Sequence, residues 1–312
     1  MHSGNGYKRR TAPPLPQRIT IRNPIVKQTL VRLAGLIAFA GYAALVSCSS
    51  VEAQGIFPDK ALEAAVRQEV FAKRYNTEPI TADDVKNISE VKGVGKGIEN
   101  LEGLQHCVAL QMVNFKNNKI KDLAPMKELK LLQQVFLNGN QIESIEPLSG
   151  LIQMQYLELS NNKVSDLTAL KAMSNMRSLY LSDNQIKSLE PIGELKKVWS
   201  LYVARNPIEN FAPVGNLKWL THFDGQGCKI KDLSFLKPLA ELKYLMLADN
   251  ELGDLGPLVE MCAADMADRK QFAPFLQVYL PNNPLQDKCK NEQLPKLKEF
   301  GVRIHTEPLK KK

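Results

Sequence analysis

One segment in the middle of the chain reads Leu179-Tyr180-Leu181-Ser182-Asp183-Asn184-Gln185-Ile186, and close copies of it recur every 22 residues. Cys228 stands where this spacing expects one more asparagine, and an insertion of 11 residues lengthens the last interval. A fixed period of this length predicts a solenoid of stacked coils. We call the recurring asparagines the asparagine ladder: Asn118, Asn140, Asn162, Asn184, Asn206, Asn250 and Asn283.

Apolar residues precede and follow each ladder position at constant spacing. Around Asn184 they are Met176, Leu179, Leu181 and Ile186, so the repeated pattern is L-x-x-L-x-L-x-x-N-x-I. Two leucines separated by one spacer predict a short strand whose alternate side chains point inward. The asparagine amide can then satisfy backbone groups of the following turn, which would otherwise be buried without partners.

The outer side of each coil has room only for short structure. A second apolar position follows the ladder, and proline often stands two residues later, at Pro125, Pro147, Pro191, Pro213 and Pro257. Proline lacks the N–H that a helix interior needs, so it disfavours a long helix there. We therefore predict an α/β repeat fold: a curved solenoid with a parallel concave β-sheet and turns or 3-10 segments on the convex side.

These features resemble the bacterial internalin-type leucine-rich-repeat family, whose 22-residue repeat is similar to that of the eukaryotic phosphatase-regulator subfamily. The resemblance covers residues 57–304. It rests on residues 97–104, Gly-Ile-Glu-Asn-Leu-Glu-Gly-Leu, on residues 179–186 and on the closing Asn283-Pro284-Leu285. It implies the solenoid fold and the binding of proteins or other ligands on the concave face.

The segments around the repeats complete the predicted domain organisation. Terminal coils would expose an apolar end unless a cap covers it. We predict a helical N-terminal cap at 57–92, repeats at 93–285 with an insertion near 259–275, and a C-terminal cap with a basic tail at 286–312. The insertion is rich in helix formers, and it forms either a bulge on the convex side or a helix that faces a partner.

The first 48 residues are predicted to be a signal peptide, followed by a linker at 49–56. A basic leader runs into the apolar residues 33–47, which are fewer than the ~20 that a spanning helix needs. Two processing sites stay open. Leu45-Val46-Ser47-Cys48 resembles a bacterial lipobox, in which the Cys48 thiol becomes lipidated, whereas Val51-Glu52-Ala53 resembles an ordinary cleavage site.

The lipobox is favoured over ordinary cleavage, and an uncleaved membrane anchor is the third alternative. In each case we expect an exported cell-envelope protein, lipid-anchored or free in the periplasm or outside the cell. The membrane is then contacted only through the signal or the lipid anchor.

The formal net charge of +8 does not indicate a nucleic-acid-binding protein. Seven of the 41 Lys and Arg residues precede the first acidic residue, Glu52, and removing them leaves 34 basic against 33 acidic residues. Nucleic-acid-binding proteins gather basic side chains on the binding face, because neutralising phosphates supplies much of the affinity. The nearly neutral remainder argues against a nucleic-acid partner.

Aromatic residues recur six or four positions before the ladder, where side chains point out of the concave sheet. Such residues concentrate at binding hot spots, because they give a large contact area at a low entropic cost. We predict that they bind a protein, with a polysaccharide as the alternative ligand. We call them the aromatic stripe: Phe136, Tyr156, Tyr180, Tyr202, His222, Tyr244 and Tyr279, with Trp199 at the border.

A second interpretation of the aromatic stripe is structural. Strands favour aromatic residues, and cross-strand pairs stabilise a sheet without any ligand. The protein would then be a structural or self-associating component of the cell envelope.

No motif in the sequence indicates catalysis, a metal or a cofactor. The histidines are His2, His106, His222 and His305, and none lies in an H-E-x-x-H motif; G-x-S-x-G is also absent. Cys107 and Cys228 are expected to be buried thiols. Export would permit a disulfide between Cys262 and Cys289, although spacing alone cannot show that they are close.

Overall fold

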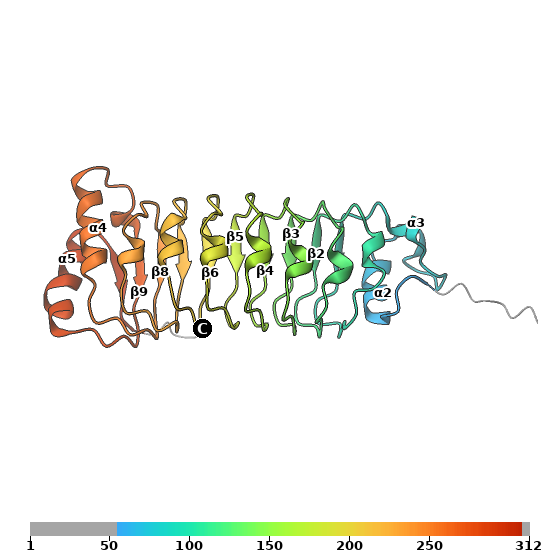
Figure 1. The fold of residues 1–312 in the computed structure, drawn as a ribbon, viewed down its shortest axis with the longest axis horizontal. Helices are drawn as coiled ribbons and strands as arrows, with labels where there is room; N and C mark the ends of the chain where they lie inside the picture. Colours follow the sequence, from blue (N-terminus) through green and yellow to red (C-terminus); the bar gives the residue numbers. More distant parts are fainter. Residues whose placement is uncertain (1–54, 308–312) are drawn as a thin grey trace, which may run out of the picture. The chain divides into compact units, whose positions relative to one another are not determined.

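The computed structural model describes residues 55–307. Within them, ten strands lie parallel in one open sheet, in sequence order (Figure 1). This confirms the predicted solenoid with a parallel sheet. Each strand has three residues: β1 (Glu90–Lys92), β2 (Met112–Asn114), β3 (Gln134–Phe136), β4 (Tyr156–Glu158), β5 (Ser178–Tyr180), β6 (Ser200–Tyr202), β7 (His222–Asp224), β8 (Tyr244–Met246), β9 (Gln277–Tyr279) and β10 (Arg303–His305).

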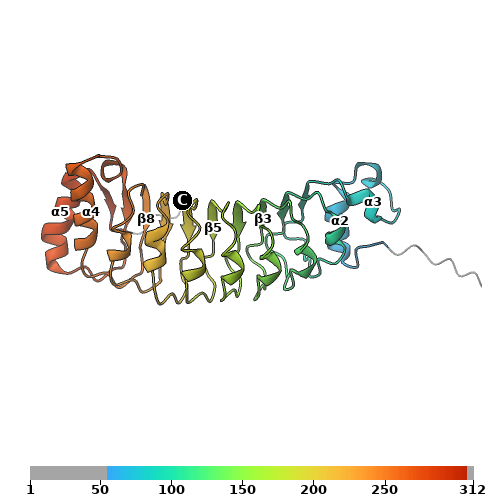
Figure 2. The same cartoon turned by 45° about the horizontal axis from the view of Figure 1, so that its top comes forward.

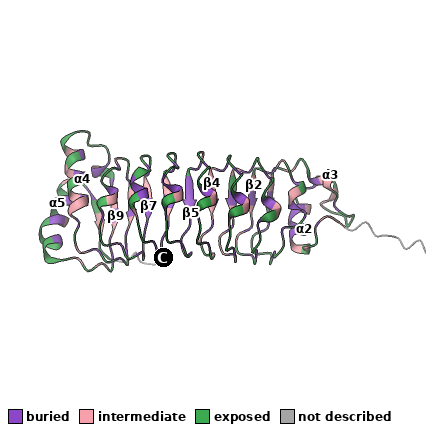
Figure 3. Ribbon diagram, in the orientation of Figure 1, coloured by how far each residue is buried: buried purple, intermediate pink, exposed green. Residues whose placement is uncertain are grey.

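The register of the sheet follows the repeat. Equivalent residues of neighbouring coils pair, so Leu179 lies between Leu157 and Leu201. These central strand residues are fully buried, whereas the flanking strand residues are mostly half-buried (Figure 3). The buried apolar residues form one continuous core cluster that runs through all the coils.

Short 3-10 segments occupy the side of the coils opposite the strands, as Figure 2 shows. Four of them have proline in the first turn, where the ring presets a helical φ and the missing N–H is not needed. The prediction of 3-10 segments is therefore confirmed. They are η2 (Leu104–His106), η3 (Ala124–Met126), η4 (Glu146–Leu148), η5 (Thr168–Leu170), η6 (Glu190–Ile192), η7 (Ala212–Asn216) and η8 (Ser234–Leu236); a further 3-10 segment, η9 (Ala273–Phe275), directly precedes β9.

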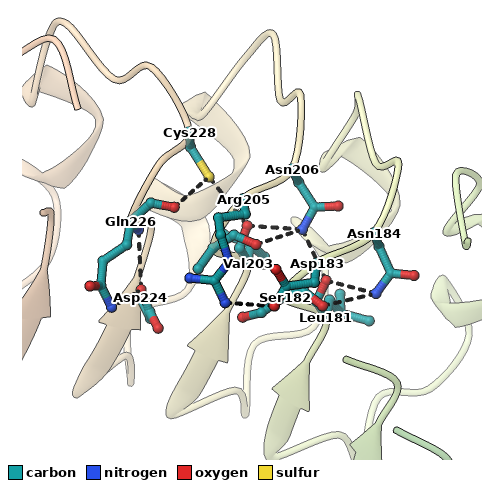
Figure 4. Close-up of polar contacts among 11 residues, drawn as sticks. Leu181, Ser182, Asp183, Asn184, Val203, Arg205, Asn206, Asp224, Gln226 and Cys228 are labelled. Carbon is teal, nitrogen blue, oxygen red and sulfur yellow. Dashed lines mark hydrogen bonds and ion pairs between the residues drawn. The ribbon is translucent and has the colours of Figure 1, made fainter. Parts of the chain in front are cut away.

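The asparagine ladder joins each coil to the one before it. The Asn184 Oδ1 accepts a hydrogen bond from the Val164 N–H at 2.9 Å. Its Nδ2 donates to the carbonyls of Leu159 and Leu181, each at 3.0 Å, so one side chain bridges two coils. Figure 4 shows the equivalent contacts of Asn206 with the Leu181 and Val203 carbonyls, each at 2.9 Å. At Cys228 the thiol replaces the amide, and its Sγ donates only to the Val203 carbonyl at 3.2 Å and, more weakly, to Gln226.

Helical segments precede the repeats. Asp59 connects them to the first coil: one carboxylate oxygen caps α2 by accepting from two N–H groups at 2.8 and 3.0 Å. The other oxygen accepts from the N–H groups of Glu99 and Asn100 at 2.8 and 3.0 Å. A single carboxylate thus holds the helix against the turn that enters the repeats. The segments are α2 (Lys60–Arg67), η1 (Phe71–Lys73) and α3 (Ala82–Val85).

The insertion forms helix α4 (Gly256–Ala267), which takes the place of the 3-10 segment in its coil. It therefore lies opposite the strands and does not flank the aromatic stripe. The buried Asp265 holds the loop that follows α4: its carboxylate accepts hydrogen bonds from the backbone N–H groups of residues 271, 272 and 273 at 3.0 to 3.2 Å. The π-helix η10 (Cys289–Gln293) and α5 (Leu294–Glu299) follow, and α5 packs against β10.

The four cysteines of the described residues are buried free thiols. For Cys107 and Cys228 this agrees with the prediction. The bridge considered between Cys262 and Cys289 is not formed. Burial raises the pKa of the Cys262 thiol to about 12, which keeps it protonated and unreactive at neutral pH.

The predicted signal peptide, Cys48 and the processing sites lie outside the described residues, as do residues 308–312 of the basic tail. Between residues 55 and 307, no helix has the length and apolar character needed to cross a membrane.

Candidate functional site

The strands expose one face, which we call the sheet face and define by the first and third residue of every strand. In β4, for example, Leu157 is buried while Tyr156 and Glu158 on either side are half-buried. The alternation arises because successive side chains of a strand point to opposite sides. Seven of the eight residues predicted for the stripe occupy these positions; Trp199 directly precedes β6.

Four aromatic rings form a continuous stack on this face, and we call them the aromatic quartet. The ring centroids of Phe136 and Tyr156 are 4.7 Å apart, those of Tyr156 and Tyr180 are 5.1 Å apart, and those of Tyr180 and Tyr202 are 4.5 Å apart. Tyr156 is the first residue of its strand and its neighbours are the third of theirs, so its contacts run diagonally across the sheet. The stack spans four consecutive strands.

Beyond the quartet the aromatic stripe is interrupted. His222 stacks on Tyr244 at 4.7 Å and 20°, and Tyr279 stacks on His305 at 4.3 Å and 8°. Within residues 55–307 no ring contact joins the quartet to the first pair or the first pair to the second. The in-register partner of Tyr202 is Asp224, which has no ring, and the diagonal neighbour His222 stacks on Tyr244 instead.

His305 was missed as a stripe residue by sequence reasoning. It is the third residue of β10 and pairs with Tyr279 in register. Aligning Arg303-Ile304-His305 with the repeat pattern, with Ile304 as the buried central residue, would have found it. Trp199 borders the quartet: its Nε1 donates to Ser178 Oγ at 2.9 Å, and the Arg177 guanidinium lies 5.8 Å from the ring centroid.

Burial shifts the pKa of several groups on the sheet face. It raises the pKa of the Tyr156 hydroxyl and, likewise, that of Tyr202, which favours their neutral forms. Burial together with the nearby Lys243 lowers the pKa of His222, which favours its neutral form. Burial also raises the pKa of Asp224, partly opposed by hydrogen bonds from the backbone and side chain of Gln226 at 3.1 and 3.0 Å.

Two cavities lie C-terminal to the quartet in the solenoid. One, of about 290 Å³, lies between β8 and β9 on the sheet face and is walled by Tyr244 and Tyr279. The other, of about 510 Å³, lies beside Cys228 and Ile208, in the turns that follow β6 and β7. Among residues 55–307 no three His, Cys, Asp or Glu side chains are grouped so that they could hold a metal ion.

This architecture is similar to that of known leucine-rich-repeat proteins. A family model described as leucine-rich repeats (2 copies) matches residues 130–172. A search of the curated proteins finds no match. The structure of internalin C2 from Listeria monocytogenes is 32% identical, with a TM-score of 0.63, over 66% of this chain and 91% of that one.

Two further solved structures share the fold. An internalin of Listeria monocytogenes, inlF, is 20% identical with a TM-score of 0.60, over 82% of this chain and 92% of that one. A leucine-rich-repeat protein of Leptospira interrogans is 22% identical with a TM-score of 0.56, over 65% of this chain and 56% of that one. Together with the 22-residue ladder, the likeness to internalin C2 shows that the chain belongs to the bacterial internalin-type leucine-rich-repeat family.

Proposed function

We propose that the protein is an exported binding module that docks a protein partner on its sheet face, predicted to be concave. The aromatic quartet is the observation that carries the proposal. Four rings stack side by side on a face of the sheet that no other element of residues 55–307 covers, and each ring is half-buried rather than enclosed. Aromatic surfaces of this kind are typical of hot spots in protein interfaces.

The size and chemistry of the face support a macromolecule as the ligand. Ten strands spaced at ~4.8 Å give a sheet face roughly 43 Å long, which suits a folded domain or an extended chain. The hydroxyls of the three quartet tyrosines can donate hydrogen bonds at the rim of an apolar contact. A polysaccharide could use the same rings, and it is the alternative outcome of the test.

Self-association through the β1 edge of the sheet receives less support. Helix α2 packs against β1 and covers this end of the sheet. A covered edge does not offer its unpaired N–H and C=O groups to another copy of the chain. The structural alternative therefore requires contacts elsewhere than at the β1 edge.

Export is the second part of the proposal. It is supported by the basic leader, the apolar residues 33–47 and the lipobox-like residues 45–48. Labelling with a radioactive fatty acid should mark the full chain and not its Cys48→Ala variant. Equal labelling of the two would contradict lipidation at Cys48.

The binding test compares two triple variants in cross-linked capture from envelope extracts. The first changes Tyr156, Tyr180 and Tyr202 to Ser. The matched control changes to Ser three exposed aromatic residues away from the sheet face: Phe71, Tyr75 and Phe275. We expect the partner to be lost with the first variant and kept with the control, while circular dichroism shows both variants folded. Equal capture by the two variants would overturn the proposal, and a carbohydrate in the captured material would identify a polysaccharide ligand.

A further inference from the structure

We propose that the cavity between Tyr244 and Tyr279 receives a basic side chain, lysine or arginine, of the protein partner. The inference rests on the proposed function, because it names the chemistry by which the same face would hold its partner. The cavity measures about 290 Å³. Sites for small molecules typically measure ~300 to 1,000 Å³, so this one suits a single side chain better than a whole cofactor.

The cavity lies between two diagonal rings of the aromatic stripe that stack on other neighbours instead of on each other. Tyr244 is the first residue of β8, and the register pairs it with Gln277. Tyr279 is the third residue of β9 and pairs with Met246. The two rings therefore lie diagonally, and no ring fills the space between them. Residues with short side chains follow both strands and leave the space open; the complete lining is Gln226, Tyr244, Met246, Ala248, Asp249, Tyr279, Pro281 and Asn282.

Both tyrosine walls are supported by rings on the neighbouring strands. His222 of β7 stacks on Tyr244, and His305 of β10 stacks on Tyr279. The Tyr279 hydroxyl also donates to Gln277 Oε1 at 3.2 Å. These contacts hold the walls before any ligand binds, so little freedom is lost on binding.

The charge of the cavity favours a cation. Its lining contains the carboxylate of Asp249, which accepts a hydrogen bond from Asn282 Nδ2 at 2.6 Å, and it contains no lysine or arginine. A second carboxylate, Asp224, lies behind Gln226, which donates to it. Arg205, in the coil before Asp224, is already paired with Asp183.

Two aromatic faces elsewhere on the stripe, those of Phe136 and Trp199, already have cations of the chain itself. Lys116 Nζ lies 5.1 Å from the centroid of the Phe136 ring, and the Arg177 guanidinium lies 5.8 Å from that of Trp199. Within residues 55–307 no such contact involves Tyr244 or Tyr279. A cation within about 6 Å of a ring face is attracted to it, so these two rings with Asp249 beside them form an unfilled site of the same kind.

The test titrates the full chain, methyl-labelled at methionine, with four acetylated and amidated peptides of sequence Gly-Ser-X-Ser-Gly, where X is Arg, Lys, Leu or Glu. The Met246 methyl resonance, assigned with Met246→Leu, reports on the cavity by nuclear magnetic resonance. The Arg and Lys peptides should shift it saturably, whereas the Leu and Glu peptides should not. An equal shift by the Leu peptide would show an apolar site, and no shift by any peptide would likewise overturn the proposal.

Two variants and a control locate the interaction. Asp249→Asn should weaken binding of the Arg peptide about three- to fivefold, as expected for a partly exposed ion pair. Tyr279→Leu should weaken it by roughly the same factor, since the ring supplies the cation–π contact. Asp232→Asn removes an acid on the other side of the coil and should change nothing. Loss of binding in the control as in Asp249→Asn would indicate nonspecific attraction to surface carboxylates.

Failure of this inference is distinguishable from failure of the proposed function. The titration uses free peptides and does not require that a partner be known. If capture of the partner depends on the quartet while no peptide shifts Met246, the proposed function stands and the basic side-chain site is rejected. If the peptides bind but capture does not depend on the quartet, the cavity stands and docking on the quartet is rejected.

Discussion

The coil that ends at Asn184 and the coil that ends at Cys228 have the same length and the same strand pairing, yet they stack differently. The Asn184 Oδ1 accepts a hydrogen bond from the Val164 N–H at 2.9 Å. At Cys228 the thiol has no equivalent oxygen, and the Ile208 N–H has no acceptor among the described residues. Ile208 is accordingly 7% exposed, whereas Ile186 at the same position of the preceding coil is fully buried.

A second contact is lost at the same place. Where a ladder asparagine is not followed by proline, the next residue donates to the preceding coil, as Gln185 does to the Val164 carbonyl at 2.9 Å. Lys229 makes no such bond within residues 55–307, and the cavity of about 510 Å³ lies between it and Arg205. The strands nevertheless remain in register across this point. The strand pairing and the ladder contacts therefore join neighbouring coils independently. At Cys228 the ladder contacts are lost while the strands still pair.

The largest expected effect comes from breaking a regular ladder position. Asn184→Ala leaves the Val164 N–H buried without a partner, which costs about 1 to 3 kcal/mol. It also removes one of the two amide donors of the Leu159 and Leu181 carbonyls, which keep their hydrogen bonds from Asn162 and Asn206. We expect the free energy of unfolding, measured with urea, to fall by about 3 kcal/mol. Cys228→Ala should lower it by about 1 kcal/mol, because only weak hydrogen bonds are removed. Asn175→Ala, at a half-buried asparagine outside the ladder, is the control, and equal losses at Asn184 and Cys228 would contradict the comparison.

The second prediction concerns the amides of the two coils. Because Ile208 donates to no acceptor while Ile186 donates to Asn206 Oδ1 at 3.0 Å, the Ile208 amide should exchange its hydrogen at least about tenfold faster. Hydrogen exchange followed by nuclear magnetic resonance, corrected for intrinsic rates, measures the ratio. Equal protection of the two amides would show that the coil at Cys228 is as closed as its neighbours.

The third prediction repairs the ladder. Cys228→Asn supplies an acceptor for the Ile208 N–H and a donor for the Val203 carbonyl, and the adjacent cavity leaves space for the amide. The free energy of unfolding should rise by about 1 kcal/mol, the usual net value of a hydrogen bond. Cys107→Asn is the matched control: Cys107 lies in the apolar core, and burying an amide there should be destabilising. A loss of stability in Cys228→Asn would contradict the role assigned to the missing oxygen.

The smallest effect concerns Asp224, in the same coil as Cys228. Burial raises its pKa in the folded state, so its contribution to stability is complete below the ordinary value of 3.8 and is lost as the pH rises through the folded-state pKa. Asp224→Asn removes the ionisation and should increase the free energy of unfolding at pH 7 by less than about 1 kcal/mol. At pH 3 the difference from the wild type should vanish.

Asp84 is the control of opposite sign. Hydrogen bonds from Lys73 and Thr81 lower the pKa of Asp84 to about 2, so its stabilisation is present above 3.8 and is lost as the pH falls toward 2. Asp84→Asn should therefore destabilise the protein at pH 7. If Asp224→Asn and Asp84→Asn changed stability in the same direction at pH 7, the assignment for Asp224 would be incorrect.

Much of the fold follows from the sequence because each coil contacts mainly its two neighbours, 22 residues away. Equivalent residues of neighbouring coils therefore contact each other throughout the solenoid. The repeat positions of Leu179 and Asn184 thus predict the buried contacts of the equivalent residues in all the regular coils. The weakness expected at Cys228 follows from the same argument, since a thiol cannot replace both functions of an amide. The aromatic stripe was likewise placed on the correct face by the alternation of side chains along a strand.

Its division into a quartet and two pairs was decided only by the tertiary structure. Ring contacts depend on whether an aromatic residue is the first or the third of its strand, and on the rotamer it adopts beside its neighbours. The same holds for the cavity between Tyr244 and Tyr279, for the side of the coil taken by α4, and for the unpaired state of Cys262 and Cys289. These features depend on distances between side chains, whereas the repeat period determines only which coils are neighbours.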